Sequence, residues 1–307
     1  MLKGFIPVMI TAFSQNRSID YDAMGNLVDY YVKNGSTGLF TVCLTSEMYN
    51  LYPNERLELT SFVSKKAKAI GFEGPVLATG TFGGPVEEQA DFVGQISEAG
   101  ADIVVMIPSQ LAAEDDDDAI LGERINEIVS LTGDIKLGFY ECPAPYHRFM
   151  SPELIAMCAA TGRFYYLKET SGNMDQLNRK IEAVKGSSFA IFNAHQPTAL
   201  PFLQTGGHGL SPIAANAAPR LFVELYNSVA DPVRSAALQE ATVEVAKNIR
   251  HSYPLGIKWF LQHNGFPIEP VCRTVEGDLT EEDHQAFKRE ADAISKCLES
   301  LGVQTLF

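Results

Sequence analysis

The chain has 307 residues, of which 38 are acidic and 24 basic, so its net charge at neutral pH is −14. A charge of this sign argues against nucleic acid or an anionic membrane as the main partner. Hydrophobic residues make up 46% of the chain, which is enough apolar material for a sizeable core. The length fits one large α/β barrel or two ordinary domains.

The five cysteines are scattered, which predicts free thiols rather than disulfides or a metal site. They show neither a Cys-x-x-Cys pair nor histidine-rich spacing, and they are Cys43, Cys142, Cys158, Cys272 and Cys297. Such a set is typical of the reducing cytosol. The first residues lack the apolar core of a signal peptide, and no apolar run approaches the roughly 18 residues of a membrane span. We therefore expect a cytoplasmic protein with neither a metal nor an organic cofactor.

Short apolar runs alternate along the chain with longer segments of helical period. The predicted strands, in chain order, are Phe5–Ile10, Gly38–Cys43, Val76–Thr81, Ile103–Ile107, Lys136–Tyr140, Tyr165–Lys168, Phe189–Phe192 and Gly209–Ile213. Between them the sequence predicts helices that include Tyr21–Lys33, Pro53–Ile70, Val86–Ala99, Asp117–Leu131 and Pro152–Ala160. Helix-start signals stand at the matching places, for example Asp20 and the pair Ser151-Pro152.

Eight strand–helix units predict an α/β fold with a parallel sheet. Because the strands are apolar on both faces, and because eight units close a (β/α)₈ barrel, we expect a TIM barrel over residues 1–218. A doubly wound open sheet is the second choice, since the first strand is not followed by a Gly-x-Gly-x-x-Gly turn. From residue 219 to residue 307 the pattern is helical only, which predicts a C-terminal helical extension.

The acidic run Glu114-Asp-Asp-Asp-Asp118 resembles a cation site at first sight. It lacks the alternating ligand spacing of such a site. Acidic residues are also favoured in the first turn of a helix by the helix dipole. We therefore interpret the run as the start of the helix that follows the fourth strand.

Lys168 is the residue that carries most of the functional prediction. It ends the aromatic strand Arg163-Phe-Tyr-Tyr-Leu-Lys168 and precedes Glu169-Thr-Ser-Gly172. Lysine is rarely buried unless it is paired or has a function. Desolvation there would lower its pKa and leave a neutral amine that can attack a carbonyl. Alternatively, the lysine extends from a strand end to water.

Other strand ends supply partners for that lysine, because the strands of a barrel carry chemistry at their C-terminal ends. Tyr140 would lie one strand away and could move protons. Thr45 and Ser46 offer hydroxyl and backbone N–H groups that suit a small carboxylate. The set favours Schiff-base chemistry, with Lys168, Tyr140 and Thr45 as catalytic residues. Each also has a structural interpretation: a core tyrosine, a helix cap and, for His195, a loop histidine.

These residues resemble a known family, the dihydrodipicolinate synthase / N-acetylneuraminate lyase group of class I, pyruvate-type aldolases. The similarity runs from Gly4 to about Arg273. The matching blocks, in order, are Gly4–Phe13, Leu44–Glu47 with Glu55-Arg56, Gly100–Pro108, Leu137–Tyr140 with Pro143, Leu167–Gly172, and Gly206–Ser211 with Asn216 and Pro219.

The resemblance implies that Lys168 forms an imine with a 2-oxo acid and that Tyr140 is the acid/base. It implies that Thr45 and Ser46 hold the substrate carboxylate and that Ile213 lines the pocket through its backbone. Because the family is mostly tetrameric, we expect a homo-oligomer, a tetramer or a dimer. The expected partner is a small 2-oxo acid, without nucleic acid or membrane.

The sequence also departs from the family pattern. Ser109-Gln110-Leu111 replaces the usual Pro-Tyr-Tyr, so the tyrosine that many members lend to a neighbouring subunit is missing. Pro145 occupies the expected place of the arginine that binds the second substrate, and Arg148 is the candidate substitute. These changes argue against lysine biosynthesis. A dehydratase of a sugar acid and a non-catalytic barrel with a binding role stay open beside the aldolase or lyase.

Overall fold

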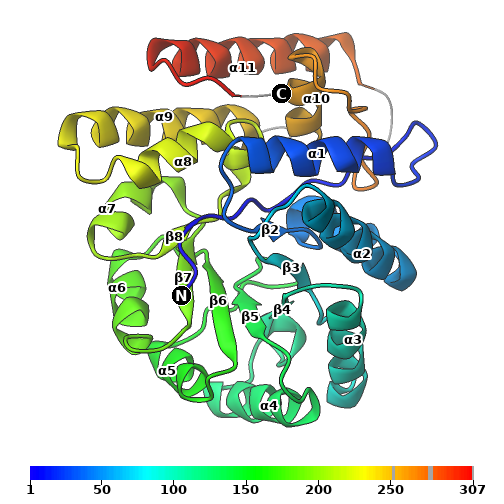
Figure 1. The fold of residues 1–307 in the computed structure, drawn as a ribbon, viewed down its shortest axis with the longest axis vertical. Helices are drawn as coiled ribbons and strands as arrows, with labels where there is room; N and C mark the ends of the chain where they lie inside the picture. The colour runs from blue at the N-terminus through cyan, green and yellow to red at the C-terminus, as the bar shows by residue number, and fades with distance from the viewer. Residues whose placement is uncertain (251–252, 276–278, 306–307) are drawn as a thin grey trace.

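Eight parallel strands form the centre of the molecule, which a computed structural model describes over residues 1–250, 253–275 and 279–305 (Figure 1). The strands run in the order β1-β8-β7-β6-β5-β4-β3-β2. A parallel bridge between Val8 and Phe40 joins the two ends of this sheet and closes the barrel. The predicted (β/α)₈ fold is therefore confirmed. The strands are β1 (Gly4–Phe5), β2 (Leu39–Phe40), β3 (Val76–Thr79), β4 (Ile103–Met106), β5 (Leu137–Tyr140), β6 (Phe164–Glu169), β7 (Ala190–Asn193) and β8 (Gly209–Leu210).

Helices follow the strands in turn and surround them. The first seven are α1 (Tyr21–Lys33), α2 (Pro53–Ala69), α3 (Val86–Glu98), α4 (Asp118–Leu131), α5 (Pro152–Ala160), α6 (Met174–Ala183) and α7 (Ala199–Gln204). The side chains of Asp20, Asp117 and Ser151 each accept a backbone N–H of the first helical turn. The acidic run before α4 thus acts as a helix start, as predicted.

Six of the eight strands are shorter than the sequence predicts, and the largest differences, of three or four residues, are in β1, β2 and β8. Proline has no backbone N–H, so it cannot donate a ladder hydrogen bond. Pro7 therefore limits β1 to two residues, and contact with β2 resumes only at Val8. Pro212 lies just after β8 in the same way. These apolar segments are buried just as strands are, so their hydrophobicity in the sequence does not distinguish them from strands.

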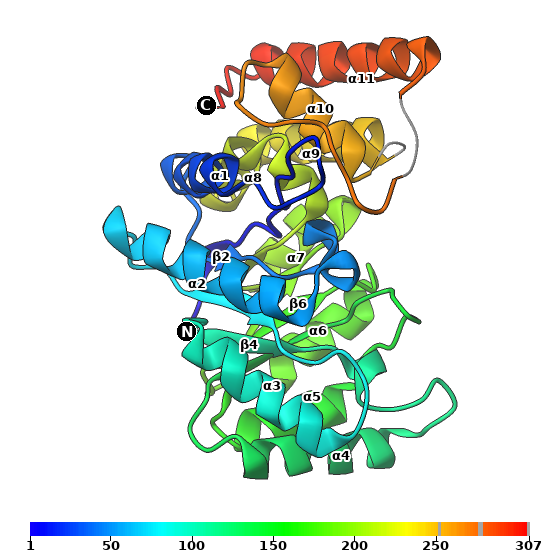
Figure 2. The same ribbon diagram turned by 90° about the vertical axis from the view of Figure 1, so that its right-hand side faces the viewer.

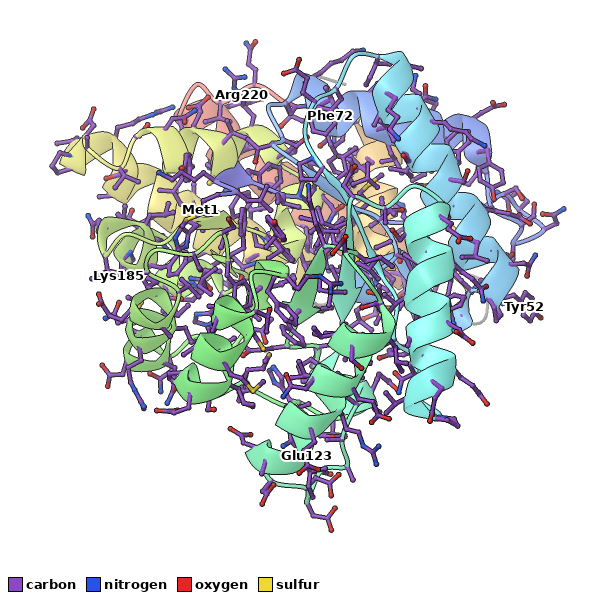
Figure 3. All side chains as sticks on the ribbon, turned by 60° about the horizontal axis from the view of Figure 1, so that its bottom comes forward. Met1, Tyr52, Phe72, Glu123, Lys185 and Arg220 are labelled. Carbon is purple, nitrogen blue, oxygen red and sulfur yellow. The ribbon has the colours of Figure 1, made fainter. Side chains whose placement is uncertain are left out.

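Aromatic side chains fill the inside of the barrel. Tyr166 lies within 6 Å of both Phe40 and Phe192, at ring-centre distances of 5.9 and 5.1 Å. Its buried hydroxyl donates to the Ser211 hydroxyl at 2.8 Å, which in turn donates to the Ile6 carbonyl. Charged side chains on the outside of the molecule point away from this core, as Glu123 of α4 and Lys185, just after α6, do in Figure 3. The interior is a packed core, so ligands reach only the ends of the barrel.

The chain ends in four further helices, which lie together at one side of the molecule (Figures 1 and 2). They are α8 (Pro219–Asn227), α9 (Pro232–Arg250), α10 (Leu255–His263) and α11 (Glu281–Ser300). Helix α8 contacts β1 and β8, whereas α11 contacts α9 and α10. A domain boundary at residue 218 stays a prediction. None of the described helices is long and apolar enough to cross a membrane.

Candidate active site

Lys168 lies near the C-terminal end of β6, where its side chain is almost completely buried at 2% exposure. It pairs in register with Tyr140 at the end of β5. The Lys168 Nζ lies 4.2 Å from the centre of the Tyr140 ring. Burial lowers the pKa of Lys168 to about 8, with the thiols of Cys43 and Cys142 acting in the opposite direction. About a tenth of this amine is therefore neutral, and hence nucleophilic, at pH 7, far more than for an ordinary lysine.

The lysine opens into a cavity of about 600 Å³ at the mouth of the barrel. Lys168, Tyr140 and Ile213 line it together with Tyr253, which follows α9. The rest of the wall is largely apolar and comes from loops and from α9: Leu44, Pro143, Pro197, Val243, Ala246 and Ile249. This volume is in the range of small-molecule sites. The structure thus brings the lysine, the tyrosine and the isoleucine together around one cavity.

Thr45 and Ser46 lie in a short 3₁₀ turn, Leu44–Ser46, after β2. Both are buried beside the cavity, and neither is among its lining residues, whereas Leu44 is. The Ser46 hydroxyl accepts the Cys43 N–H at 2.8 Å and donates to the Cys43 carbonyl at 2.6 Å. The Ser46 hydroxyl therefore shapes the turn from within.

The polar side chains that line the cavity beside Lys168 and the tyrosines are His147, Thr170, His195, Gln196 and Lys247. His147 Nε2 and the Thr170 hydroxyl are 2.7 Å apart, and that hydroxyl also donates to the Glu141 carbonyl. Burial lowers the pKa of His147. His195 lies on the loop after β7, with its Nδ1 3.1 Å from the Thr198 hydroxyl. Arg148 lies elsewhere, because its guanidinium donates to the carbonyls of Ala113 and Asp117.

A buried charge cluster supports the strand ends next to Lys168. Lys180 of α6 donates to Glu141 at 2.6 Å and to Glu169 at 3.0 Å, and all three side chains are buried. Burial, then the nearby Glu169, raises the pKa of Glu141 to about 6, against the effect of Lys180. Glu141 also accepts the N–H of Met150 and of Thr170. The cluster therefore fixes the loop after β5 and the start of the loop after β6.

We expect Lys180→Met to lower the free energy of unfolding by about 3–5 kcal/mol, because it leaves two carboxylates buried without a counter-charge. Urea denaturation at neutral pH measures the change. Lys185→Met is the matched control, since that lysine pairs with Glu182 at 67% exposure and should change stability by less than about 1 kcal/mol. Equal losses in the two variants would contradict this role of Lys180.

A second buried carboxylate connects the loop after β2 to the C-terminal part of the chain. Glu47 accepts the Lys258 ammonium at 2.7 Å, and the N–H groups of Arg273 and Thr274 at 2.6 and 2.8 Å. Burial opposes ionisation, but Lys258 and Thr274 hold the pKa of Glu47 below its ordinary value. Glu47 also has a left-handed backbone, with φ of 60°. The turn that carries Thr45 is therefore anchored to residues more than 200 positions later.

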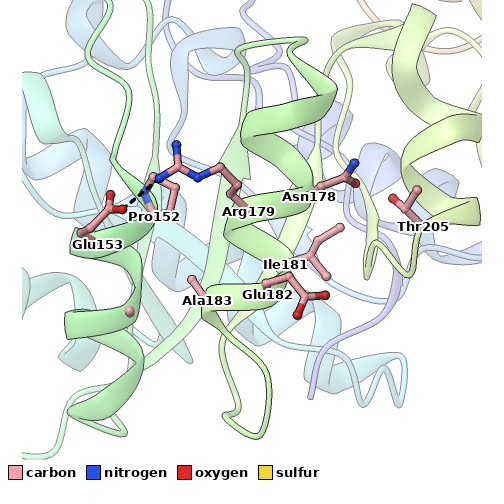
Figure 4. Close-up of a pocket in the computed structure, with 9 residues that line it drawn as sticks. Pro152, Glu153, Asn178, Arg179, Ile181, Glu182, Ala183 and Thr205 are labelled. Atoms are coloured by element: carbon pink, nitrogen blue, oxygen red, sulfur yellow. Dashed lines mark hydrogen bonds and ion pairs between the residues drawn. The ribbon is translucent and has the colours of Figure 1, made fainter.

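Another depression lies on the outer surface between α5 and α6 and reaches Thr205 (Figure 4). Its volume is about 690 Å³. Arg179 and Glu153 form an ion pair of 2.9 Å at its edge, and both side chains are more than half exposed. Among the described residues that line it there is no lysine, cysteine or histidine. It is therefore not the place where a carbonyl would be activated.

A buried, partly neutral lysine beside a tyrosine at a barrel mouth is the arrangement that imine-forming enzymes require. A model of the dihydrodipicolinate synthetase family matches residues 1–294. The chain belongs to this family. Members of the family are class I enzymes that form a lysine imine with pyruvate, so the predicted family and class of chemistry are confirmed.

Individual relatives agree with the family assignment. A 4-hydroxy-tetrahydrodipicolinate synthase of Neisseria gonorrhoeae is 30% identical over 235 residues, which cover 73% of this chain and 75% of the relative. One of Methanothrix thermoacetophila is 26% identical over 273 residues, covering 89% and 87%. The solved 4-hydroxy-tetrahydrodipicolinate synthase of Methylacidiphilum fumariolicum SolV has the same fold, with a TM-score of 0.85 at 18% identity, over 98% of this chain and 99% of that one.

Several residues at the site of this family member escape sequence reasoning. Tyr253 follows a helix rather than a strand, so no positional rule indicates it. Lys180 and Lys258 lie in amphipathic helices, where lysine is usually solvated. The cysteine pattern predicts only the cellular compartment. In the structure, Cys43 and Cys142 lie close enough to Lys168 to influence its pKa. Burial raises the pKa of Cys43 to about 11, so its thiol is protonated at neutral pH.

Proposed function

We propose that the protein is a class I aldolase or lyase in which Lys168 condenses with pyruvate or a pyruvate-derived 2-oxo acid. The observation that carries this proposal is a buried lysine with a lowered pKa, in contact with the Tyr140 ring, in a cavity at the strand ends. Such an amine attacks the ketone, and the resulting iminium withdraws electrons from the neighbouring carbon. Retention of this chemistry also speaks against a barrel that only binds.

In the proposed reaction Tyr140 supplies the proton that the departing hydroxyl needs. Burial, followed by the influence of Cys142, keeps the pKa of Tyr140 well above its ordinary value, so the phenol is protonated before reaction. Thr45 lies next to the cavity and extends the set of hydroxyls. We propose that the turn of Thr45 and Ser46 holds the substrate carboxylate, and that Ile213, which lines the same cavity, contributes through its backbone. The Ser46 hydroxyl stabilises that turn from within.

Trapping with borohydride tests the proposal. The protein is incubated with pyruvate, reduced with borohydride and digested, and its peptides are analysed by mass spectrometry. We expect one reduced pyruvate on the peptide that carries Lys168. If the protein gains no mass in this experiment, the proposed imine is ruled out, whether or not the protein binds pyruvate.

The pKa of Lys168 predicts how imine formation depends on pH. Because the neutral amine is the reactive form, a pKa of about 8 makes the rate rise up to about pH 8 and then level off. Between pH 8 and pH 10 the rate should increase only about twofold, whereas an ordinary lysine would give on the order of a hundredfold. Initial rates from quenched trapping across this range measure it. A rate that still climbs steeply at pH 10 would contradict the lowered pKa.

A carbon–carbon lyase and a sugar-acid dehydratase both use the same imine. The second substrate therefore distinguishes the two reactions. Relatives carry the name 4-hydroxy-tetrahydrodipicolinate synthase. Among the described residues that line the cavity none is an arginine, and Arg148 is bonded to the loop after β4. We therefore propose a second substrate that is held by His147, Thr170 and the apolar wall. Product analysis separates the two reactions, since a dehydratase releases water and keeps the carbon chain whole.

Assembly and location stay predictions. From the family we propose a homo-oligomer, a dimer or a tetramer, in the cytoplasm. Light scattering coupled to size-exclusion chromatography measures the mass in solution, and a monomer at micromolar concentration would contradict the proposed assembly.

A further inference from the structure

Tyr253 presents a buried hydroxyl that the fold does not explain. The residue lines the same cavity as Lys168 and Tyr140. Its oxygen is shielded from solvent and has no hydrogen-bond partner among the residues that the structure describes. Burying a hydroxyl without a partner is unfavourable by about 1–3 kcal/mol, and most buried polar groups are therefore satisfied. An unpaired hydroxyl of this kind, beside reacting groups, indicates a role in which it gains a hydrogen-bond partner during the reaction.

Tyr253 lies close to both Thr45 and Tyr140. Burial raises its pKa, and Thr45 is the nearby side chain that acts most strongly in the opposite direction. Thr45 is thus close to the phenol, although the two hydroxyls do not meet with hydrogen-bond geometry. Tyr253 in turn contributes to the raised pKa of Tyr140, after burial and Cys142. Three neighbouring hydroxyls therefore form a cluster, those of Tyr140, Thr45 and Tyr253.

The segment after β4 does not bring a competing phenol to this place. Ser109 is buried in a short turn, and the Gln110 side-chain amide donates to the Tyr49 hydroxyl at 3.1 Å. The Tyr49 hydroxyl itself donates to the Ala144 carbonyl at 2.8 Å. Tyr49 is therefore engaged on the outside of the loop after β5. Among the described tyrosines, Tyr253 and Tyr140 are the two that line the cavity.

We propose that Tyr253 is a relay residue that stabilises the Tyr140 phenolate formed during imine chemistry, and that it comes from the same chain as Lys168. The proposal rests on the proposed function. It requires no change in the free protein, because the Tyr253 hydroxyl is already in place. The Tyr253 hydroxyl has no hydrogen-bond partner before the reaction but can donate to the Tyr140 phenolate during it. It therefore stabilises the phenolate relative to the resting state.

The proton balance is as follows. The neutral Lys168 amine adds to the C2 carbonyl of the 2-oxo acid, and one proton moves from nitrogen to oxygen to give a neutral carbinolamine. The C2–O bond then breaks as Tyr140 gives its proton to the departing hydroxyl, which leaves as water. The products of this step are a protonated iminium and the Tyr140 phenolate, with Thr45 and Tyr253 as hydroxyl donors to that phenolate. The phenolate next takes a proton from C3, which forms the neutral enamine and restores Tyr140.

The substitution Tyr253→Phe tests the relay, because it removes only the oxygen. We expect the rates of borohydride trapping and of deuterium exchange at C3 of pyruvate to fall by about 10²-fold, the usual effect of one missing donor. The pyruvate concentration for half-maximal trapping should not change, since the hydroxyl acts after binding. The melting temperature should stay the same or rise, because an unpaired buried hydroxyl has gone.

Tyr226→Phe serves as the control, because Tyr226 lies on α8 near the Gly4 backbone, at the opposite end of the barrel, and should leave all these quantities unchanged. Wild-type rates in Tyr253→Phe would overturn the relay. A melting temperature that falls together with the rate would assign Tyr253 a structural role and overturn it as well. A wild-type protein that is not trapped at all would instead refute the proposed function.

Discussion

We expect Lys168→Ala to form no adduct with pyruvate and borohydride under conditions in which the wild-type protein is fully labelled. The variant lacks the amine, and the other buried lysines cannot replace it. Lys180 is held between two carboxylates, and Lys258 is held by Glu47 and the Val271 carbonyl. Neither lysine is among the described residues that line the cavity. Intact-mass measurement before and after reduction gives the result directly.

A measurement of stability makes the Lys168 result specific. Lys168 is buried and its ammonium form is disfavoured, so its removal should leave the melting temperature unchanged or raise it. Lys185→Ala, at an exposed position, is the control and should be labelled as the wild type is. Complete labelling of Lys168→Ala at another lysine would show that the imine forms elsewhere. Loss of the adduct together with loss of folding would be tested again with Lys168→Met, which keeps the volume.

The second large effect is expected for Tyr140→Phe, which should slow imine formation by about 10²–10⁴-fold, the usual contribution of a positioned acid/base. The ring is kept, so the packing of Lys168 against it, at 4.2 Å, is kept too. The variant should therefore reach the same final mass after long incubation. Quenched-flow trapping resolves the rate, and the end point shows that the lysine is intact.

The combination of Tyr140→Phe with Tyr253→Phe gives a further check on the roles of these two residues. If Tyr253 acts through the Tyr140 phenolate, the double variant should be no slower than Tyr140→Phe alone, because the second hydroxyl has lost its target. Rates that multiply would mean that the two phenols act independently. An unchanged rate in Tyr140→Phe would move the acid role to another donor at the cavity.

The features that the sequence predicts well are those with a local signal. Apolar runs gave the strands within a few residues, and capping residues gave the helix starts, because both depend on neighbours in the chain. Lys168 and Tyr140 were predictable since a strand end in a barrel has a known place in space. Ser46 shows the limit, because a hydroxyl in the turn after a strand can equally bond its own turn.

The features that the sequence cannot predict depend on distant partners. Nothing near Glu47 indicates that it meets Lys258 and Arg273, and a lysine in α10 resembles any solvated lysine. Tyr253 becomes meaningful only once its hydroxyl is seen to be buried beside the cavity. The same holds for Arg148, whose guanidinium is occupied by two carbonyls of another loop. Such assignments require the tertiary structure.

The anchoring of Glu47 has a consequence for how the protein becomes active during its synthesis. The ribosome releases the chain from its N-terminus, so residues 1–218 emerge long before Lys258 and Thr274. Until those arrive, the Glu47 carboxylate has none of its three partners from the C-terminal part, and its ionised form cannot be buried at acceptable free energy. The turn with Thr45 must then stay open to water, although Lys168 has already been made. We therefore expect a prematurely terminated chain to carry Lys168 beside an unfinished turn, and to react with 2-oxo acids only once the C-terminal part is in place.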